Sequence, residues 1–267
     1  MRNLILIKLG GSVITDKNTP YLLREDNIIR LSKEIAKARK IAGRNTFFII
    51  GNGGGSFSHP LAAKYKLQNG LTNKEGLKGL SLTSNAEIEM NRIVMKHLIK
   101  AGLPVVSFAP ASFVLSRNHK VYKLFLDPIG ETLARGIVPV IYGDMIIDVI
   151  LGCMAFSSEK VLGILALKFG PQFDRVKIIN CTGTDGVYDK SGNTIPVINT
   201  NNFETFKHFI GPSDQIDVTG GMSHKVDEAL KLAREGVTSL IINGQRKGNL
   251  TNAILGKQVT GTLICKS

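Results

Sequence analysis

The chain has 267 residues, a hydrophobic fraction of 43% and a formal net charge of +13. This composition excludes a disordered chain and supports a substantial aliphatic core, while no apolar run is long enough to span a membrane. The three cysteines lie far apart in the sequence and predict reduced thiols in a cytoplasmic protein, not disulfides or a metal site. Because the positive charge is spread over ordinary helix faces, we interpret most of it as solvated surface, with a minority concentrated at a site for a small polyanionic ligand. We expect no nucleic-acid or membrane partner.

The first predicted strand, residues 4–9, carries a lysine near its end. Lys8 stands directly before the Gly-Gly-Ser of residues 10–12, and Lys17 is a second cation nearby. A lysine in this position is well placed to meet a phosphate whose other oxygens contact the glycine N–H groups. The alternative is a lysine at a strand edge whose ammonium group reaches solvent without a ligand. The motif is not the P-loop, because the lysine precedes the glycines.

A glycine-rich stretch, Gly-Asn-Gly-Gly-Gly-Ser-Phe-Ser-His, follows the strand predicted at residues 46–50 and ends at His59. Residues 25–42 have the apolar spacing of a helix that ends at Gly43. Strand, helix and strand predict a parallel βαβ unit, whose two glycine-rich turns lie at one edge of the sheet. Consecutive glycines make little sense as packing, so we interpret them as backbone donors for phosphate, with His59 as an added donor. The alternative is a glycine-rich turn with a surface histidine.

The remaining sequence continues to alternate between helices and strands, with no internal repeat, low-complexity tract or linker. The predicted helices are residues 80–101, 128–135, 161–169 and 226–235, and another is expected to begin near Pro60. The predicted strands are residues 105–108, 138–142, 176–180 and 239–242, with residues 261–264 as a final edge strand. A polar loop with two glycines follows residue 180, and a third glycine-rich turn at residues 217–225 precedes the fourth of these helices.

Five motifs follow one another along nearly the whole chain. They are Lys-Leu-Gly-Gly-Ser-Val-Ile-Thr-Asp-Lys at residues 8–17, Gly-Gly-Gly-Ser-Phe-Ser-His at 53–59, Tyr-Gly-Asp at 142–144, Asp-Gly-Val-Tyr at 185–188, and Asp-Val-Thr-Gly-Gly-Met-Ser-His-Lys at 217–225. In this order they resemble the amino acid kinase superfamily. The paired glycines belong to the superfamily at large. The Thr-Asp-Lys and Ser-Phe-x-His endings are more specific to its isopentenyl phosphate kinase branch.

The resemblance implies a three-layer αβα sandwich with a mainly parallel central sheet, built as a single domain over residues 1–267 and usually a homodimer. Its N-terminal half, residues 1–150, would bind the phosphate acceptor, and its C-terminal half, residues 151–267, would bind ATP. The implied reaction transfers the γ-phosphoryl group of ATP to isopentenyl phosphate in isoprenoid biosynthesis. Mg²⁺ would bridge the nucleotide phosphates, without a dedicated set of protein ligands.

The resemblance also assigns roles to individual residues. The catalytic residues would be Lys8, Lys17, His59 and Lys225. The acceptor would be bound by Gly54, Gly55, Ser56, His59, Gly143 and Asp144. ATP would be bound by Lys8, Gly10, Gly11, Ser12, Lys17, Asp185, Gly186, Tyr188, Gly220, Gly221 and Lys225. Because the acceptor is already an oxyanion, no strong general base is needed, and His59 is expected to donate a hydrogen bond to the acceptor phosphate.

The sequence departs from the pattern of that branch at several positions. The departures are Asn52 for His, Ser58 for Gly, Glu159 and Lys160 for two acids, Gly183 for an acid, and His224 for a small or basic residue. We expect Lys160 to lie near the nucleotide phosphates or to pair with Glu159 or another carboxylate. Two alternatives stay open: a related kinase for another small phosphate or phosphonate, and a catalytically weak nucleotide-binding regulatory protein. Kinases of amino-acid carboxylates fit less well, and nucleic-acid binding rests on net charge alone.

Overall fold

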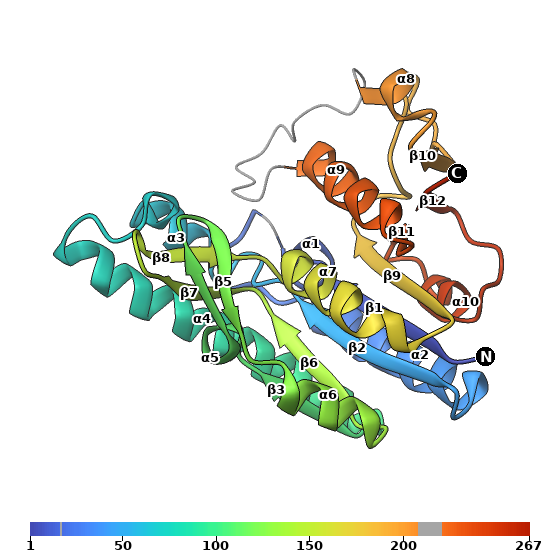
Figure 1. Cartoon of the computed structure of the whole chain (residues 1–267), viewed down its shortest axis with the longest axis horizontal. Helices are drawn as coiled ribbons and strands as arrows, with labels where there is room; N and C mark the ends of the chain where they lie inside the picture. The colour runs from blue at the N-terminus through green and yellow to red at the C-terminus, as the bar shows by residue number, and fades with distance from the viewer. Residues whose placement is uncertain (17, 208–220) are drawn as a thin grey trace.

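The centre of the fold is an eight-stranded sheet in the order β10-β12-β11-β9-β1-β2-β6-β3 (Figure 1). The computed structural model describes residues 1–16, 18–207 and 221–267. The strands of this sheet are β1 (Asn3–Leu9), β2 (Thr46–Asn52), β3 (Val105–Phe108), β6 (Val138–Tyr142), β9 (Arg175–Thr182), β10 (Val197–Asn199), β11 (Thr238–Asn243) and β12 (Gly261–Cys265). β1 pairs in parallel with both β2 and β9, so strands from the two halves of the chain meet in one sheet.

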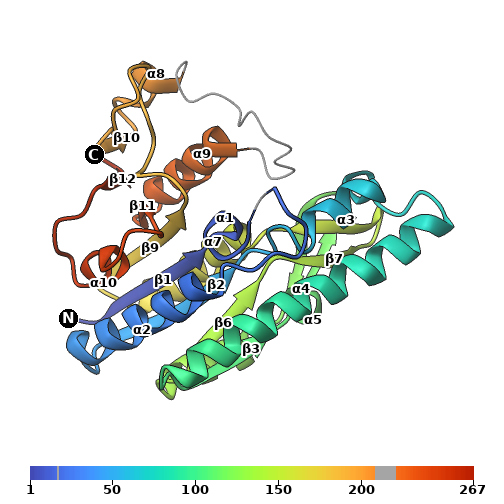
Figure 2. The same cartoon turned by 180° about the vertical axis from the view of Figure 1, so that it is seen from behind.

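Helices cover both faces of this sheet, as Figures 1 and 2 show from opposite sides. One face is covered by α2 (Glu25–Ala42), α4 (Lys74–Lys100) and α10 (Asn249–Ile254), and the other by α6 (Asp127–Ala134), α7 (Ser158–Phe169) and α9 (Gly221–Arg234). β1 contributes to both layers, because Ile5, Ile7 and Leu9 pack on the α2 side and Leu4 and Leu6 on the α7 side. The predicted three-layer αβα sandwich is confirmed.

Shorter elements complete the fold. The remaining helices are α1 (Gly11–Ile14), α3 (His59–Lys64), α5 (Pro110–Phe113) and α8 (Phe203–Lys207), with 3₁₀ turns at Leu67–Asn69 and Gly170–Gln172. A second sheet has the order β5-β4-β7-β8, formed by β4 (Val114–Arg117), β5 (Lys120–Leu124), β7 (Asp144–Asp148) and β8 (Gly152–Phe156). None of the helices within the described ranges is long and apolar enough to cross a membrane.

Several predicted boundaries differ from the structure, and side-chain caps explain two of them. α4 begins at residue 74 instead of residue 80, because the side chain of Asn73 accepts a hydrogen bond from the Gly76 N–H. α7 begins at residue 158 instead of residue 161, because Ser157 accepts from the N–H three residues later. The acidic and basic residues at positions 159 and 160 therefore lie in the first turn of a helix.

One predicted strand position was wrong. β12 is not an edge strand, because it lies between β11 and β10, and β10 forms this edge of the sheet. β10 has three residues, too few for a periodic signal in the sequence. β12 runs antiparallel to β11, whereas β11 is parallel to β9, so the order of the sheet at this end could not be read from the helix–strand alternation.

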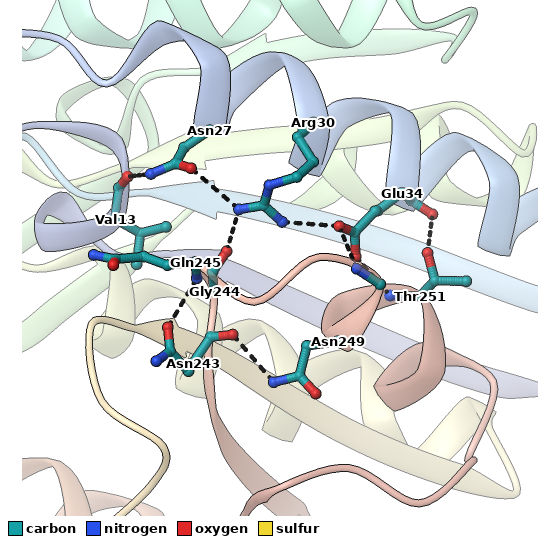
Figure 3. Close-up of polar contacts among 10 residues, drawn as sticks. Val13, Asn27, Arg30, Glu34, Asn243, Gly244, Gln245, Asn249 and Thr251 are labelled. Carbon is teal, nitrogen blue, oxygen red and sulfur yellow. Dashed lines mark hydrogen bonds and ion pairs between the residues drawn. The ribbon is translucent and has the colours of Figure 1, made fainter.

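A polar network joins α2 to the loop after β11 and to α10 (Figure 3). Arg30 donates to the Gly244 carbonyl at 2.5 Å and to the Glu34 carboxylate at 2.8 Å. The same carboxylate accepts from the backbone N–H groups of Gly248 at 2.9 Å and Thr251 at 3.2 Å, so it caps the start of α10. Glu34 is buried. The network therefore fixes the loop after β11 against a helix from the N-terminal half of the chain.

We predict that Glu34→Ala lowers the free energy of unfolding by about 3 kcal/mol, because it leaves the Arg30 guanidinium and two helix N–H groups without their partner. The matched control is Glu131→Ala, which removes an ion pair of the same helical spacing with Arg135, but on exposed side chains. The control should change stability little, because exposed pairs are well solvated. Urea denaturation measures both, and equal losses would show that the α2 network has no special role.

Candidate active site

The carboxyl ends of β1, β2 and β9 lie at one edge of the sheet and bring three loops together. Leu9 is flanked by Asn52 in β2 and by Cys181 in β9. The N–H of Gly10 donates to the Cys181 carbonyl at 3.0 Å, and the N–H of Gly53 donates to the Leu9 carbonyl at 3.0 Å. The prediction that the first two glycine-rich turns share one edge of the sheet is confirmed.

The two glycine-rich turns contact each other through their backbones. A Cβ atom on Gly11 would lie 2.6 Å from the Gly55 Cα, and one on Gly10 would lie 2.5 Å from the Cys181 carbonyl oxygen. Gly55 has φ of +56°, and a Cβ there would collide with the Thr15 hydroxyl. The interpretation that these glycines have no packing role was therefore wrong: the turns approach too closely for side chains.

A carboxylate from α7 forms an ion pair with a lysine of β1 at this edge. The Lys8 ammonium lies 2.8 Å from the Glu159 carboxylate, and their side chains are 12% and 18% exposed. Burial alone would raise the pKa of Glu159, but the charges of Lys8, Lys225 and His224 outweigh it and hold that pKa below its usual value. Lys225 also donates to the Gly221 carbonyl at 3.4 Å. The ionised Glu159 thus pairs with the lysine of β1 and is stabilised by the charge of a second lysine from α9.

Lys160 takes no part in this cluster of charges. The partner of Glu159 is Lys8, and within the described part of the chain Lys160 forms no ion pair. The expected pairing of Lys160 with Glu159 or another carboxylate is therefore not observed. A position near the nucleotide phosphates stays a prediction.

On the other side of the first two turns, Gly54 rests against the side chain of Glu87 from α4. The Ser58 hydroxyl donates to Glu87 Oε1. Burial, together with the smaller effect of Asp144, raises the pKa of Glu87 to about 8, although the hydrogen bond from Ser58 opposes the shift. Burial also raises the pKa of Asp144, whose carboxylate accepts backbone hydrogen bonds from Ala111 and Met145. Two buried acids thus lie behind the second glycine-rich turn.

Some buried polar atoms at this edge have no hydrogen-bond partner among the described residues, including Asn52 Nδ2 and Ser56 Oγ. Asn52 Oδ1 accepts from Asn91 at 3.0 Å, and Asn91 in turn accepts from Ser107 at 2.6 Å. A buried polar atom without a partner is costly unless a ligand or water satisfies it. The edge therefore keeps hydrogen-bonding capacity for a polar ligand beside the glycine-rich turns.

The loop after β9 lies beside the first glycine-rich turn. A Cβ atom on Gly183 would lie 3.8 Å from the Ser12 hydroxyl. The Asp185 carboxylate pairs with Arg246, and the backbone N–H of Asp185 donates to the Tyr188 hydroxyl at 3.0 Å. Arg246 follows β11, so the loops after β9 and β11 are held together on the C-terminal side of the site.

Comparisons with known proteins agree with this arrangement. A model of the amino acid kinase family matches residues 3–243. This chain belongs to the amino acid kinase family. The isopentenyl phosphate kinases of Methanothermobacter thermautotrophicus and Methanocaldococcus jannaschii are 33% and 34% identical to it, each over 98% of both chains. A solved structure described as isopentenyl phosphate kinase is 31% identical, with a TM-score of 0.81, over 98% of this chain and 100% of that chain.

The structure of this amino acid kinase family member places most of the predicted site residues near one edge. Lys8, Gly10, Gly11, Gly54, Gly55 and Ser56 lie on or beside the loops that meet there, and Lys225 lies near enough for its charge to act on Glu159. The Gly143 N–H donates to the Asn52 carbonyl at 3.1 Å. His59 begins α3, and Gly221 begins α9. Lys17 and Gly220 lie outside the described residues.

Sequence reasoning left three side chains of this region out of the predicted site. Glu159 aligns with an acid of the family pattern, which was the available signal for it. Glu87 carries a weaker signal, since it shares the apolar face of α4 with Met90 and Val94, where a charged residue is unusual. Arg246 has no local signal, because its partner Asp185 is distant in the sequence.

We predict that Glu159→Gln removes a pH-dependent part of the stability of the fold. The pKa of Glu159 is lower in the folded chain than in the unfolded chain, so its contribution is present above the unfolded pKa and lost as pH falls through the folded pKa. The difference in free energy of unfolding between wild type and Glu159→Gln should therefore shrink from about pH 5 to about pH 3. Glu204→Gln, on an exposed pair, is the control and should show no such trend.

Proposed function

We propose that this chain transfers the γ-phosphoryl group of ATP to isopentenyl phosphate, giving isopentenyl diphosphate and ADP. The observation that supports this most strongly is the ion pair between Lys8 and Glu159, whose carboxylate also feels the charge of Lys225, at the edge where the two glycine-rich turns touch. The match to isopentenyl phosphate kinases over nearly the full length of the chain supports the same reaction in isoprenoid biosynthesis. Residues 1–150 are proposed as the acceptor half of one domain and residues 151–267 as the nucleotide half.

The reaction joins two anions. An oxygen of the acceptor phosphate attacks Pγ, and the bond between Pγ and the bridging oxygen of ADP breaks. The main demands on the protein are charge neutralisation and in-line positioning. Lys8 is proposed to meet the transferring phosphoryl group and Lys225 the ATP phosphates. Glu159 is proposed to orient Lys8, with which it forms an ion pair, and Lys17 is proposed as a further cation.

The acceptor phosphate is proposed to lie against the second glycine-rich turn. Gly54, Gly55 and Ser56 would supply donors, and His59 would donate from the start of α3. The buried Oγ of Ser56, which has no hydrogen-bond partner within the described part of the chain, supports this placement. Gly143 and Asp144 are proposed to shape the same side of the site.

The homodimer implied by the resemblance stays a prediction.

ATP is proposed to lie on the C-terminal side. Its contacts would come from Gly10, Gly11, Ser12, Asp185, Gly186, Tyr188, Gly220 and Gly221, in addition to the lysines. Mg²⁺ would be bound by the nucleotide phosphates and water. Within the described ranges, no group of three or more His, Cys, Asp or Glu side chains is placed to hold a metal ion. Because these residues do not form a metal cage, no step of the mechanism is assigned to the ion.

An assay of ADP release across a panel of small phosphates tests the proposed function. With ATP and Mg²⁺, isopentenyl phosphate should release ADP, and the corresponding alcohol should not. Greater turnover of another phosphate or a phosphonate would establish the related-kinase alternative. Heat stabilisation by ATP, without ADP from any acceptor, would establish a nucleotide-binding protein instead.

Lys8→Ala is predicted to lower kcat roughly a hundredfold, or about 3 kcal/mol, because one charge-assisted donor to the transferring group is lost. Lys96→Ala, at an exposed position of α4, is the control for removing a lysine. The double variant Lys8→Ala/Glu159→Gln removes the carboxylate left unpaired and should not recover turnover. Recovery in the double variant would assign the defect to the unpaired charge and not to the missing donor.

His59→Ala is predicted to reduce kcat/KM for the acceptor strongly and to leave ATP binding, measured alone, nearly unchanged. A phosphate bound to the turn favours a hydrogen-bond donor at this position, so His59→Gln and His59→Asn should retain more activity than the alanine variant. Equal losses for both substrates would indicate that His59 acts only through the stability of α3.

A further inference from the structure

We propose that Glu87 is a positioning residue for the acceptor loop, residues 53–59: its protonated carboxyl supports the loop, and its ionisation weakens acceptor binding. This inference rests on the proposed function, because it concerns the phosphate that the loop is proposed to bind. Glu87 is not proposed to contact the acceptor. It acts through the backbone of Gly54 and the hydroxyl of Ser58.

The contact between Glu87 and the loop is direct. Glu87 is 6% exposed and lies on the buried face of α4. A Cβ atom on Gly54 would collide with both oxygens of the Glu87 carboxyl and with the Ser58 hydroxyl. Ser58 donates to Oε1, whereas Oε2 is buried and has no partner among the described residues. The loop is therefore held from behind at Gly54 and at Ser58, one residue before His59.

The surroundings of Glu87 favour its uncharged form. Among the described residues, three titratable groups lie around it. Asp144 on β7 raises the pKa of Glu87, Glu87 in turn raises the pKa of Tyr142 on β6, and the loop itself carries His59. Burial, together with the smaller effect of Asp144, raises the pKa of Glu87 to about 8 against the opposing effect of the hydrogen bond from Ser58. The carboxyl is therefore protonated at neutral pH and ionises in mildly alkaline solution.

Ionisation of Glu87 would place a negative charge directly behind Gly54. The loop in front of that charge is proposed to hold a phosphate, and the two anions repel each other. The ATP side, with Lys225 and the loops after β9 and β11, lies on the other half of the sheet. Alkaline pH should therefore weaken acceptor binding more than ATP binding.

The test is the pH dependence of acceptor kcat/KM for wild type, Glu87→Gln and Glu89→Gln. Wild type should lose about tenfold between pH 7 and pH 9, the change expected when a group that titrates near pH 8 must stay protonated. Glu87→Gln keeps an uncharged side chain of the same shape and should lose this alkaline limb. Glu89→Gln makes the same change two residues later on the exposed face and should behave as wild type. An unchanged alkaline limb in Glu87→Gln would overturn the proposal.

Ser58→Ala gives a second test with a defined direction. The hydroxyl stabilises the ionised carboxylate, so its removal should move the alkaline limb to higher pH. A purely structural role for this contact would instead lower activity by the same factor at every pH. A limb that stays in place, or moves to lower pH, contradicts the assignment.

Thermal unfolding without substrate separates this inference from the proposed function. The pKa of Glu87 is higher in the folded chain than in the unfolded chain, so the folded chain keeps a proton that the unfolded chain releases. Wild type should therefore lose stability relative to Glu87→Gln as pH rises from about 5 to about 8. A Tm difference that does not change with pH overturns the inference even if the enzyme is active. If no acceptor is phosphorylated, the proposed function fails, and calorimetry of inorganic phosphate binding across the same pH range tests Glu87.

Discussion

The parallel register of β1 against β2 and β9 is the constraint on which the site depends. In this register Leu9 lies beside Asn52 and Cys181, so the loops that follow β1, β2 and β9 leave the sheet side by side at one edge. Two of these turns approach within backbone contact, which only glycine permits. Side chains alternate along β1, so Lys8 points to the face opposite Leu9. That face is covered by α7, and the ion pair between Lys8 and Glu159 follows from this geometry.

Two glutamates near this edge have pKa shifts of opposite sign. Glu159 pairs with Lys8 and also feels the charge of Lys225, and these charges outweigh the cost of burial, so it is ionised. Glu87 meets Asp144 and a single hydroxyl donor, so burial prevails and it is protonated. The same residue type thus serves two purposes, set by its neighbours. One glutamate holds cations on the proposed nucleotide side, and the other supports a loop without adding negative charge to the acceptor side.

Local sequence signals predicted the parts of the fold that depend on local structure. The apolar spacing of α2 and the alternating strands and helices around β1 were sufficient for a parallel βαβ unit and for the shared edge of the turns, whereas the three αβα layers were predicted from the resemblance of the motifs to the amino acid kinase superfamily. The position of β12 and the four-stranded sheet were missed, because their pairing joins short strands with little periodicity. The packing role of the glycines and the role of Glu87 depend on contacts between distant segments, which no pattern within one segment can indicate. The roles assigned to Lys8, His59 and Lys225 stay predictions.

The departures on the acceptor side become intelligible when α4 is considered with the loop. Asn52, in place of the family's His, is hydrogen-bonded by Asn91, and Ser58, in place of its Gly, donates to Glu87. Glu87 and Asn91 lie one turn apart on the same buried face of α4. A polar side chain introduced at position 52 or 58 without its partner on α4 would be buried and unsatisfied. The loop and the helix therefore form one polar layer, and substitutions of its paired members are expected to change stability as coupled pairs and not additively.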